Sequence, residues 1–219
     1  MKIFGVLACI ALTATVMGYF SSGGSLSKKP VLVCLGDSLT SCGGPNGHYA
    51  DWLAKYLPNV HVVNAGIGGD TLDGGRLRYE RDVSPLKPDI VLIALGANDF
   101  WRRQRSVEEM GDDLLWMVKE SKRLGAEVIV VDCFGHRDFW NEVTTEFSPD
   151  RFPLAAAIGE MQETISKENG CIYVPNLQVD VKPNRLPPYW DETDHPNKEG
   201  NEQVALRLLP AIHQALSKR

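Results

Sequence analysis

An excess of positive charge is absent from this sequence, in which 23 Lys and Arg residues face 28 Asp and Glu residues and give a formal net charge of -5. Bulk attraction to nucleic acid or to an anionic membrane surface is therefore excluded, and we expect no nucleic acid partner. The sequence also has no Walker-type or GxGxxG phosphate loop and no cysteine pairs at zinc-binding spacing. These absences give no sign of a nucleotide phosphate loop or of a cysteine zinc site.

Cysteines are few, with four beyond the N-terminal region: Cys34, Cys42, Cys133 and Cys171. An even number permits two disulfide bonds in an oxidising compartment. Three of the four, however, fall in or beside apolar runs, where a thiol is an ordinary small core side chain. The sequence therefore predicts no particular pairing.

Long apolar runs are also rare, and the one of membrane-spanning character lies at the N-terminus. Residues 3–20 are uncharged, follow Lys2, and precede a segment rich in Ser, Gly and Lys at residues 21–29. The run is near the lower limit for crossing a bilayer and also resembles a secretory signal that could be cleaved after Gly18. We expect residues 1–20 to be a signal peptide or a membrane anchor, residues 21–29 a linker, and residues 30–219 an exported domain that is secreted, periplasmic or anchored. Its oligomeric state is not predicted.

Apolar runs of strand length alternate with amphipathic segments of helix length along this domain. The expected strands are residues 31–35, 60–63, 90–95, 128–131 and 171–174, and the expected helices are residues 49–56, 107–124, 154–168 and 198–217. Nearly continuous apolar runs are typical of parallel strands that are buried on both faces. The alternation predicts an α/β fold, a three-layer α/β/α sandwich around a parallel sheet of about five strands.

Three polar, glycine-containing motifs each follow one of the first three expected strands. They read Gly36-Asp37-Ser38-Leu39, Asn64-Ala65-Gly66-Ile67-Gly68-Gly69-Asp70-Thr71 and Gly96-Ala97-Asn98-Asp99. Because open parallel sheets bind ligands outside the carboxyl ends of their strands, the three motifs are expected to meet at one sheet edge.

Each motif has a chemical interpretation and a purely structural one. Ser38 is a candidate nucleophile, although Asp and Ser also fill turns and helix caps. The glycines around Gly69 can present a backbone N–H to a ligand, or can simply form a turn. The Asn98 amide can donate to a developing oxyanion, or can stabilise the strand exit as an Asx turn. We expect Asp99 to brace the loop.

A fourth motif, Asp191-Glu192-Thr193-Asp194-His195-Pro196-Asn197, precedes the last expected helix. His195 is a candidate general base, since histidine exchanges protons near neutral pH and Pro196 fixes the helix start beside it. Asp191, Glu192 and Asp194 are all available to orient the imidazole, and only one can do so.

With these motifs in this order, the sequence resembles the GDSL esterase/lipase group, also called SGNH hydrolases, from about Val31 to the last helix. The resemblance implies a flavodoxin-like fold and hydrolysis of carboxylic esters through an acyl-serine, without metal or cofactor. It makes Ser38 the nucleophile and His195 the base, with the Ser38 N–H, the Gly69 N–H and the Asn98 amide as the oxyanion hole. The family's acid usually stands three residues before the histidine, here Glu192, while a sub-pattern places it four before, at Asp191. We favour Asp191 and keep Glu192 as the alternative.

Three functions follow as hypotheses. The first is an exported esterase for O-acetylated carbohydrate or short acyl esters, and the second is a lysophospholipase or thioesterase that acts on lipid acyl esters. The third is a non-catalytic carbohydrate-binding scaffold, which has no need of a base beside a serine. Aromatic and basic residues in the segments 100–105, 134–152 and 186–190 could select the substrate or could pack the loops onto the sheet.

Overall fold

The computed structural model describes residues 28–133, 152–175, 177 and 195–219. The expected signal peptide or anchor at residues 1–20, most of the linker, and Asp191, Glu192 and Asp194 lie outside the described residues. Within the part of the chain that is described, no helix is both long enough and apolar enough to cross a membrane.

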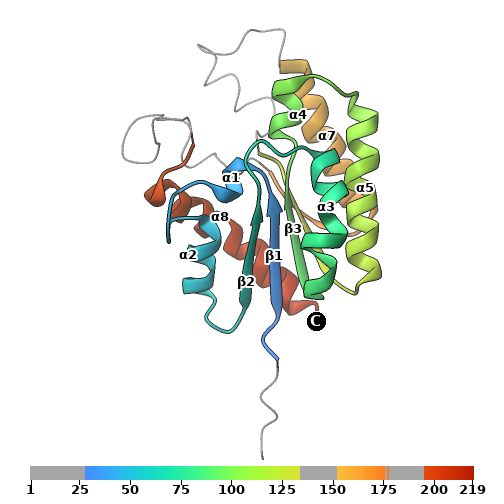
Figure 1. Cartoon of the computed structure of the whole chain (residues 1–219). Coiled ribbons are helices and arrows are strands. Elements are labelled where there is room, and N and C mark those ends of the chain that lie inside the picture. Colours follow the sequence, from blue (N-terminus) through green and yellow to red (C-terminus); the bar gives the residue numbers. More distant parts are fainter. Residues whose placement is uncertain (1–27, 134–151, 176, 178–194) are drawn as a thin grey trace, which may run out of the picture.

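A five-stranded parallel sheet forms the middle of the molecule (Figure 1). Its strands lie in the order β2-β1-β3-β4-β5. The bounds are β1 Val31–Gly36, β2 His61–Gly66, β3 Ile90–Ala94, β4 Glu127–Val131 and β5 Ile172–Val174. The chain leaves β1 toward one edge and continues from β3 toward the other. The crevice of the sheet therefore lies between the carboxyl ends of β1 and β3.

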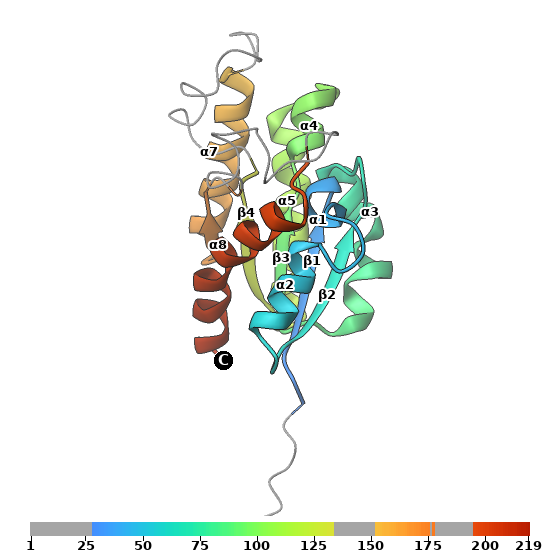
Figure 2. The ribbon, with the colours of Figure 1, turned by 90° about the vertical axis from the view of Figure 1, so that its left-hand side faces the viewer.

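Helices cover both faces of the sheet, as the two ribbon views show: α2 and α8 lie on one face, and α3, α5 and α7 on the other (Figures 1 and 2). The helices are α1 Ser38–Ser41, α2 Tyr49–Tyr56, α3 Leu72–Asp82, α4 Ala97–Arg102, α5 Val107–Arg123, α7 Phe152–Glu168 and α8 Lys198–Ser217, with a 3-10 turn at Ser84–Leu86. The predicted three-layer α/β/α sandwich is thus confirmed.

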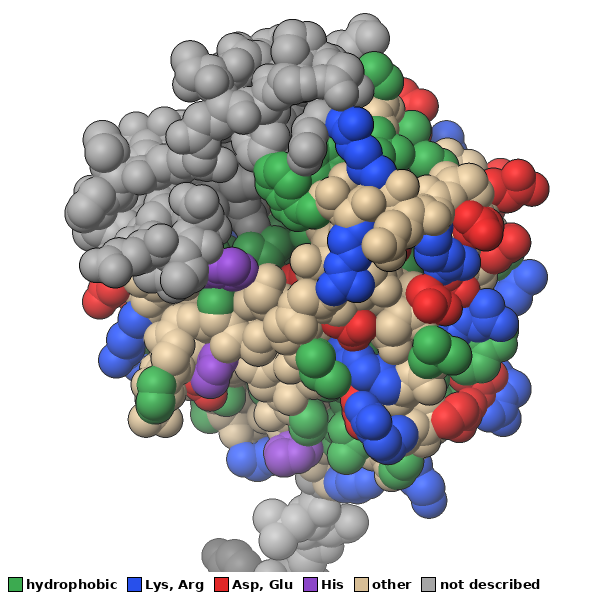
Figure 3. All heavy atoms as spheres, turned by 45° about the horizontal axis from the view of Figure 1, so that its top comes forward, with side chains coloured by type: hydrophobic (Ala, Val, Ile, Leu, Met, Phe, Trp, Pro, Cys, Tyr) green, Lys and Arg blue, Asp and Glu red, His purple; other side chains and the backbone are tan. Residues whose placement is uncertain are grey.

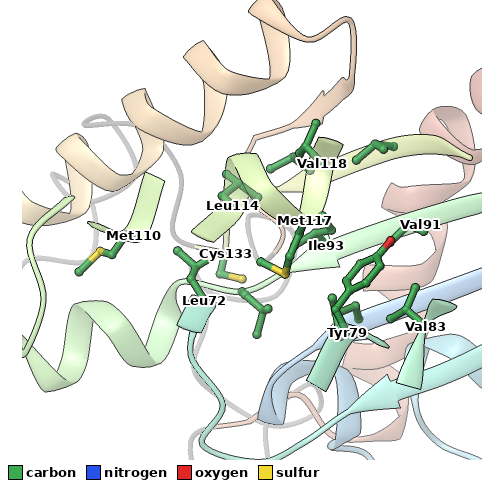
Figure 4. Close-up of a cluster of buried hydrophobic side chains, with 14 of the residues drawn as sticks. Leu72, Tyr79, Val83, Val91, Ile93, Met110, Leu114, Met117, Val118 and Cys133 are labelled. Carbon is green, nitrogen blue, oxygen red and sulfur yellow. The ribbon is translucent and has the colours of Figure 1, made fainter. Parts of the chain in front are cut away.

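The core is divided into two layers by the alternation of side chains along the buried strands. Val91 and Ile93 of β3 face the α3–α5–α7 layer, where they pack with Leu72, Tyr79 and residues of α5 (Figure 4). The alternate residues of the same strand, among them Leu92, face α2 and α8. Because every residue of β1 and β3 is buried, hydrophobic side chains are needed at consecutive positions, which explains the apolar runs.

The predicted strands and long helices agree with the structure to within a few residues, and α2 and α8 have the predicted bounds. The sequence analysis gave no bounds for α1 and missed α3 and α4. Helix α3 has two adjacent glycines and mostly charged residues, so it carries no apolar periodicity. Its start is fixed instead by Thr71, whose hydroxyl accepts a hydrogen bond from the Gly74 N–H.

The four cysteines in the described part of the chain are thiols. Cys34 and Cys133 are buried, and burial raises the pKa of the Cys34 thiol to about 12. Cys34 lies in the middle of β1 and packs in the core toward α2 and α8. The interpretation of this residue as a small core side chain is confirmed.

Candidate active site

Ser38 and His195 meet at the carboxyl edge of the sheet although 157 positions separate them in the chain. The Ser38 Oγ and the His195 Nε2 are 2.9 Å apart, within hydrogen-bonding distance. Ser38 is the first residue of α1, directly after β1, and both side chains are half-buried. A hydroxyl in contact with an imidazole at the edge of a sheet is the arrangement that activates a serine.

Glycine at the ends of β1 and β2 allows α1 to lie directly on the sheet. A Cβ on Gly36 would stand 2.0 Å from the Thr40 Oγ1 and 2.9 Å from the Ala94 carbonyl oxygen. A Cβ on Gly66 would stand 2.8 Å from the Ser41 backbone nitrogen. All three distances are shorter than real contacts, so the helix that carries Ser38 could not occupy this position if either glycine had a side chain.

The segment that carries His195 is held by an asparagine that the sequence analysis did not single out. Asn201, in the first turn of α8, is fully buried. Its side chain donates to the Pro196 carbonyl at 2.8 Å and to the Cys42 carbonyl at 3.3 Å, and accepts from the Tyr49 N–H at 3.2 Å. It thereby ties the start of α8 to the end of α1. Its position on the apolar face of α8, in line with Val204 and Leu208, was the available signal.

Asn98 joins the loops that follow β1 and β2. It lies in the first turn of α4, and its Nδ2 donates to the Asp70 carbonyl at 2.9 Å and to the Asp37 carboxylate at 3.2 Å. The three motifs that follow the first three strands are therefore in direct contact. Their predicted convergence at one sheet edge is found in the structure.

Gly69 lies in a tight turn in which the Asp70 N–H donates to the Ile67 carbonyl at 3.2 Å. Its φ of +78° is in the left-handed region, where glycine is favoured because a Cβ would be strained. The Gly69 carbonyl accepts a hydrogen bond from the Arg102 guanidinium of α4. The turn is thus held from α4, the same helix that carries Asn98.

Acidic side chains lie beneath these loops. Asp37 is fully buried, and its carboxylate accepts from the Leu39 N–H at 2.9 Å. Burial raises the Asp37 pKa to about 7, the Leu39 N–H opposes this rise, and the nearby Asp70 and Asp99 carboxylates add to it. Asp99, whose pKa burial also raises, accepts from the Leu72 N–H at 3.0 Å. The expectation that Asp99 braces the loop is confirmed.

The surface around this edge carries both hydrophobic and basic side chains. Ile67, on the loop after β2, and Trp101, on α4, are 43% and 45% exposed, and Arg102 is exposed as well. Figure 3 looks onto this end of the molecule and shows hydrophobic and basic side chains in its middle. Among the residues with described positions, no group of three or more His, Cys, Asp or Glu side chains is arranged to hold a metal ion.

Comparison with known proteins places this arrangement in a family. Residues 34–203 match the model of the GDSL-like Lipase/Acylhydrolase family, a span that contains all four motifs. The chain belongs to the GDSL-like lipase/acylhydrolase family. The resemblance stated from the motifs is confirmed, and the fold agrees with it.

Two relatives and one solved structure show the range of this GDSL family. An uncharacterized lipoprotein of Bacillus subtilis is 31% identical over 117 residues, 47% of each chain, so this chain spans about half its length. The thioesterase 1/protease 1/lysophospholipase L1 of Escherichia coli is 27% identical over 197 residues, 83% of this chain and 85% of that one. An acetyl-xylooligosaccharide esterase of Geobacillus stearothermophilus superposes with a TM-score of 0.69 at 26% identity, covering 84% of this chain and 94% of that one.

Proposed function

We propose that the protein is a serine hydrolase that cleaves carboxylic esters through an acyl-serine intermediate. The observation that carries this proposal is the 2.9 Å contact between the Ser38 Oγ and the His195 Nε2, at the sheet edge where the Asn98 amide also lies. Membership of the GDSL-like lipase/acylhydrolase family supports it. A non-catalytic scaffold would have no use for a base in contact with a serine, so we set that alternative aside.

In the proposed reaction, the Ser38 Oγ attacks the ester carbonyl while His195 accepts the hydroxyl proton. The carbonyl oxygen becomes an oxyanion, which the backbone N–H groups of Ser38 and Gly69 and the side-chain amide of Asn98 stabilise. The C–O bond then breaks, and the alcohol leaves with the proton from His195. Water, deprotonated by His195, attacks the acyl-serine carbonyl carbon. The bond from that carbon to the Ser38 Oγ breaks, the Oγ takes the proton from His195, and the carboxylic acid is released. Asp191, with Glu192 as the alternative, holds the imidazole in the required tautomer.

The Asn98 amide has two N–H groups, and their hydrogen bonds support assigning one of them to the oxyanion. One donates to the Asp70 carbonyl at 2.9 Å, and the other faces the Asp37 carboxylate at the longer distance of 3.2 Å. The shorter bond anchors the side chain. We assign the N–H with the longer hydrogen bond to the oxyanion, because less hydrogen-bond energy is lost when it turns to the substrate.

We favour O-acetylated carbohydrate or another short acyl ester as the substrate. The structural likeness to an acetyl-xylooligosaccharide esterase supports this choice, and the exposed Trp101 on α4 offers an aromatic face to a sugar. A lysophospholipase or thioesterase activity is the second candidate, and the Escherichia coli relative favours it. A panel of acetyl-sugar, short-chain and long-chain p-nitrophenyl, acyl-CoA and lysophospholipid esters separates the two by their kcat/KM values.

We also infer that the protein is exported, with residues 1–20 as a signal peptide or membrane anchor, residues 21–29 as a linker and residues 30–219 as the hydrolase domain. The lipoprotein relative and the uncharged run at residues 3–20 support this inference.

Replacing Ser38 with alanine tests the proposed reaction. Ser38→Ala should hydrolyse p-nitrophenyl acetate no faster than the solution background and should not react with a fluorophosphonate, because no acyl-serine can form. Ser41→Ala is the matched control, since this serine lies in the same helix and should leave the activity unchanged. Circular dichroism should report the same fold for all three proteins. Full activity in a folded Ser38→Ala protein would refute the mechanism.

A further inference from the structure

Helix α3 carries a buried guanidinium under the loops of the proposed active site. Arg78 is only 7% exposed. It donates to the Gly36 carbonyl at 2.9 Å, to the Ala65 carbonyl at 2.8 Å and to the carboxylates of Asp70 and Asp82 at 2.7 and 3.2 Å. Two of these acceptors are main-chain groups at the carboxyl ends of β1 and β2, which are adjacent strands. One side chain therefore connects two strand ends and the turn that follows the second strand.

The acceptors of Arg78 are the groups that place the proposed oxyanion donors. Gly36 stands two residues before Ser38, and its carbonyl also accepts from the Ile67 N–H at 3.0 Å. Asp70 follows Gly69, and its own carbonyl is the acceptor that anchors the Asn98 amide. Each proposed donor is thus close to a residue that Arg78 contacts. Ser38 is two residues from Gly36, Gly69 is adjacent to Asp70, and Asn98 is hydrogen-bonded to the Asp70 carbonyl.

The chemistry of these contacts requires arginine. A guanidinium presents five N–H groups in a fixed plane and can reach separate acceptors at once, whereas a lysine ammonium donates from a single atom. A buried cation is costly unless it is paired, and here Asp70 and Asp82 provide the pairing. Arg81, on the same helix, shows the contrast: its side chain is 71% exposed and pairs with Asp82. Within the described residues, its guanidinium has no hydrogen bond to the strand ends.

We propose that Arg78 is a positioning residue for the hydrolytic reaction. It holds the end of β1 and the Gly69–Asp70 turn at a fixed separation, so that the three N–H donors point to one oxyanion. This inference rests on the proposed function, and it adds a residue that does not touch the substrate. Preorganised donors stabilise a transition state only when they are held in place beforehand, and Arg78 supplies that constraint.

Arg78→Lys is the first test, because lysine keeps the positive charge near Asp70 but cannot serve both strand ends. We expect kcat for p-nitrophenyl acetate to fall about 30-fold or more, with KM within about threefold of wild type, since the donors act on the transition state. Tyr79→Phe is the matched control. Tyr79 lies on the same helix as Arg78, and the substitution removes its buried hydrogen bond of 2.6 Å to Ser121 of α5. It should lower stability without changing kcat.

A double-mutant cycle separates positioning from general loss of structure. Asn98→Ala alone should lower kcat by about 10²- to 10³-fold, the usual effect of losing one oxyanion donor. If Arg78 acts through the donors, adding Arg78→Lys to Asn98→Ala should cost less than it costs in the wild type. Fully multiplicative effects would overturn the inference, and so would a folded Arg78→Lys protein with wild-type kcat.

If Arg78→Lys does not fold, Asp70→Asn is tested in its place. This substitution weakens the 2.7 Å ion pair between Arg78 and Asp70 but leaves the hydrogen bonds of Arg78 to the backbone carbonyls. It should also lower kcat. An unchanged kcat in folded Asp70→Asn would overturn the inference.

A wild-type protein without esterase activity, or a fully active Ser38→Ala protein, defeats the proposed function itself. An active wild type with an inactive Ser38→Ala protein and an undiminished Arg78→Lys protein defeats the positioning role alone.

Discussion

Burial of the Asp37 carboxyl predicts that the stability of this protein depends on pH in an unusual direction. The pKa of Asp37 rises from the usual 3.8 to about 7 in the folded protein, with desolvation as the largest cause. The folded state therefore binds this proton more tightly than the unfolded chain does. The corresponding stabilisation is fully present below about pH 4 and is lost as the pH rises through about 7. Most paired carboxylates behave in the opposite way.

The magnitude follows from the two pKa values. Each pKa unit between the unfolded value of 3.8 and the folded value of about 7 corresponds to about 1.4 kcal/mol. Most of this pKa interval lies within the range from pH 5 to pH 8. Asp37 alone should therefore reduce the free energy of unfolding by about 3 kcal/mol over that range. Asp37→Asn has no charge to bury, so its stability should fall less. The new amide would face the Asn98 amide as a second donor, which adds a penalty that does not depend on pH.

Urea unfolding of wild type and Asp37→Asn at constant ionic strength, from pH 5 to pH 8, measures the effect. The difference between the two free energies of unfolding should shift by about 3 kcal/mol in favour of the variant as the pH rises. Asp112→Asn, which changes an exposed carboxylate on α5, should follow the wild-type curve. Parallel curves for Asp37→Asn and wild type would refute the reasoning. A shift in the opposite direction would show that the Leu39 and Asn98 N–H groups outweigh desolvation.

The other predictions concern the triad acid and the N-terminus. Of Asp191→Asn and Glu192→Gln, the one that removes the partner of His195 should lower kcat by about 10⁴-fold, and the other should stay close to wild type; if both keep full activity, neither residue is the acid. The intact mass of the exported protein should correspond to a chain that starts after Gly18 if a signal peptide is removed, or to the full chain in the membrane fraction if it is an anchor. Full-length protein confined to the cytosol would contradict export.

Elements of the fold could be predicted where burial leaves a local pattern of hydrophobic residues in the sequence. Strands β1 and β3 are buried on both faces, so their continuous apolar runs mark them directly. Helix α8 starts where Asn197 caps it, a signal that is local in the sequence. Helix α3 was not predictable in this way, because tertiary contacts of Leu72, Tyr79 and Arg78 hold it in place despite its glycines and charges.

The same distinction applies to the site. Ser38, Gly69 and Asn98 follow strands, so the topology of a parallel sheet brings them together. Arg78 was missed because its partners at the strand ends are backbone groups from distant parts of the chain, which leave no sequence pattern. Asn201 has one signal, its place on the apolar face of α8, but that signal does not reveal its backbone partners. The spacing upstream of His195 leaves two candidates for the triad acid, Asp191 and Glu192. Both lie outside the described residues.

The contact between Ser38 and His195 also bears on when activity can arise during folding. It spans 157 positions, and Asn201 closes the same gap by reaching Tyr49 and Cys42 across 152 and 159 positions. Contacts of such long sequence separation carry a high loop-closure entropy and form late. A chain emerging from the ribosome would hold its serine long before α8 docks against α2. Hydrolytic competence would then be acquired in the last step of folding, and its appearance would mark the completion of the domain.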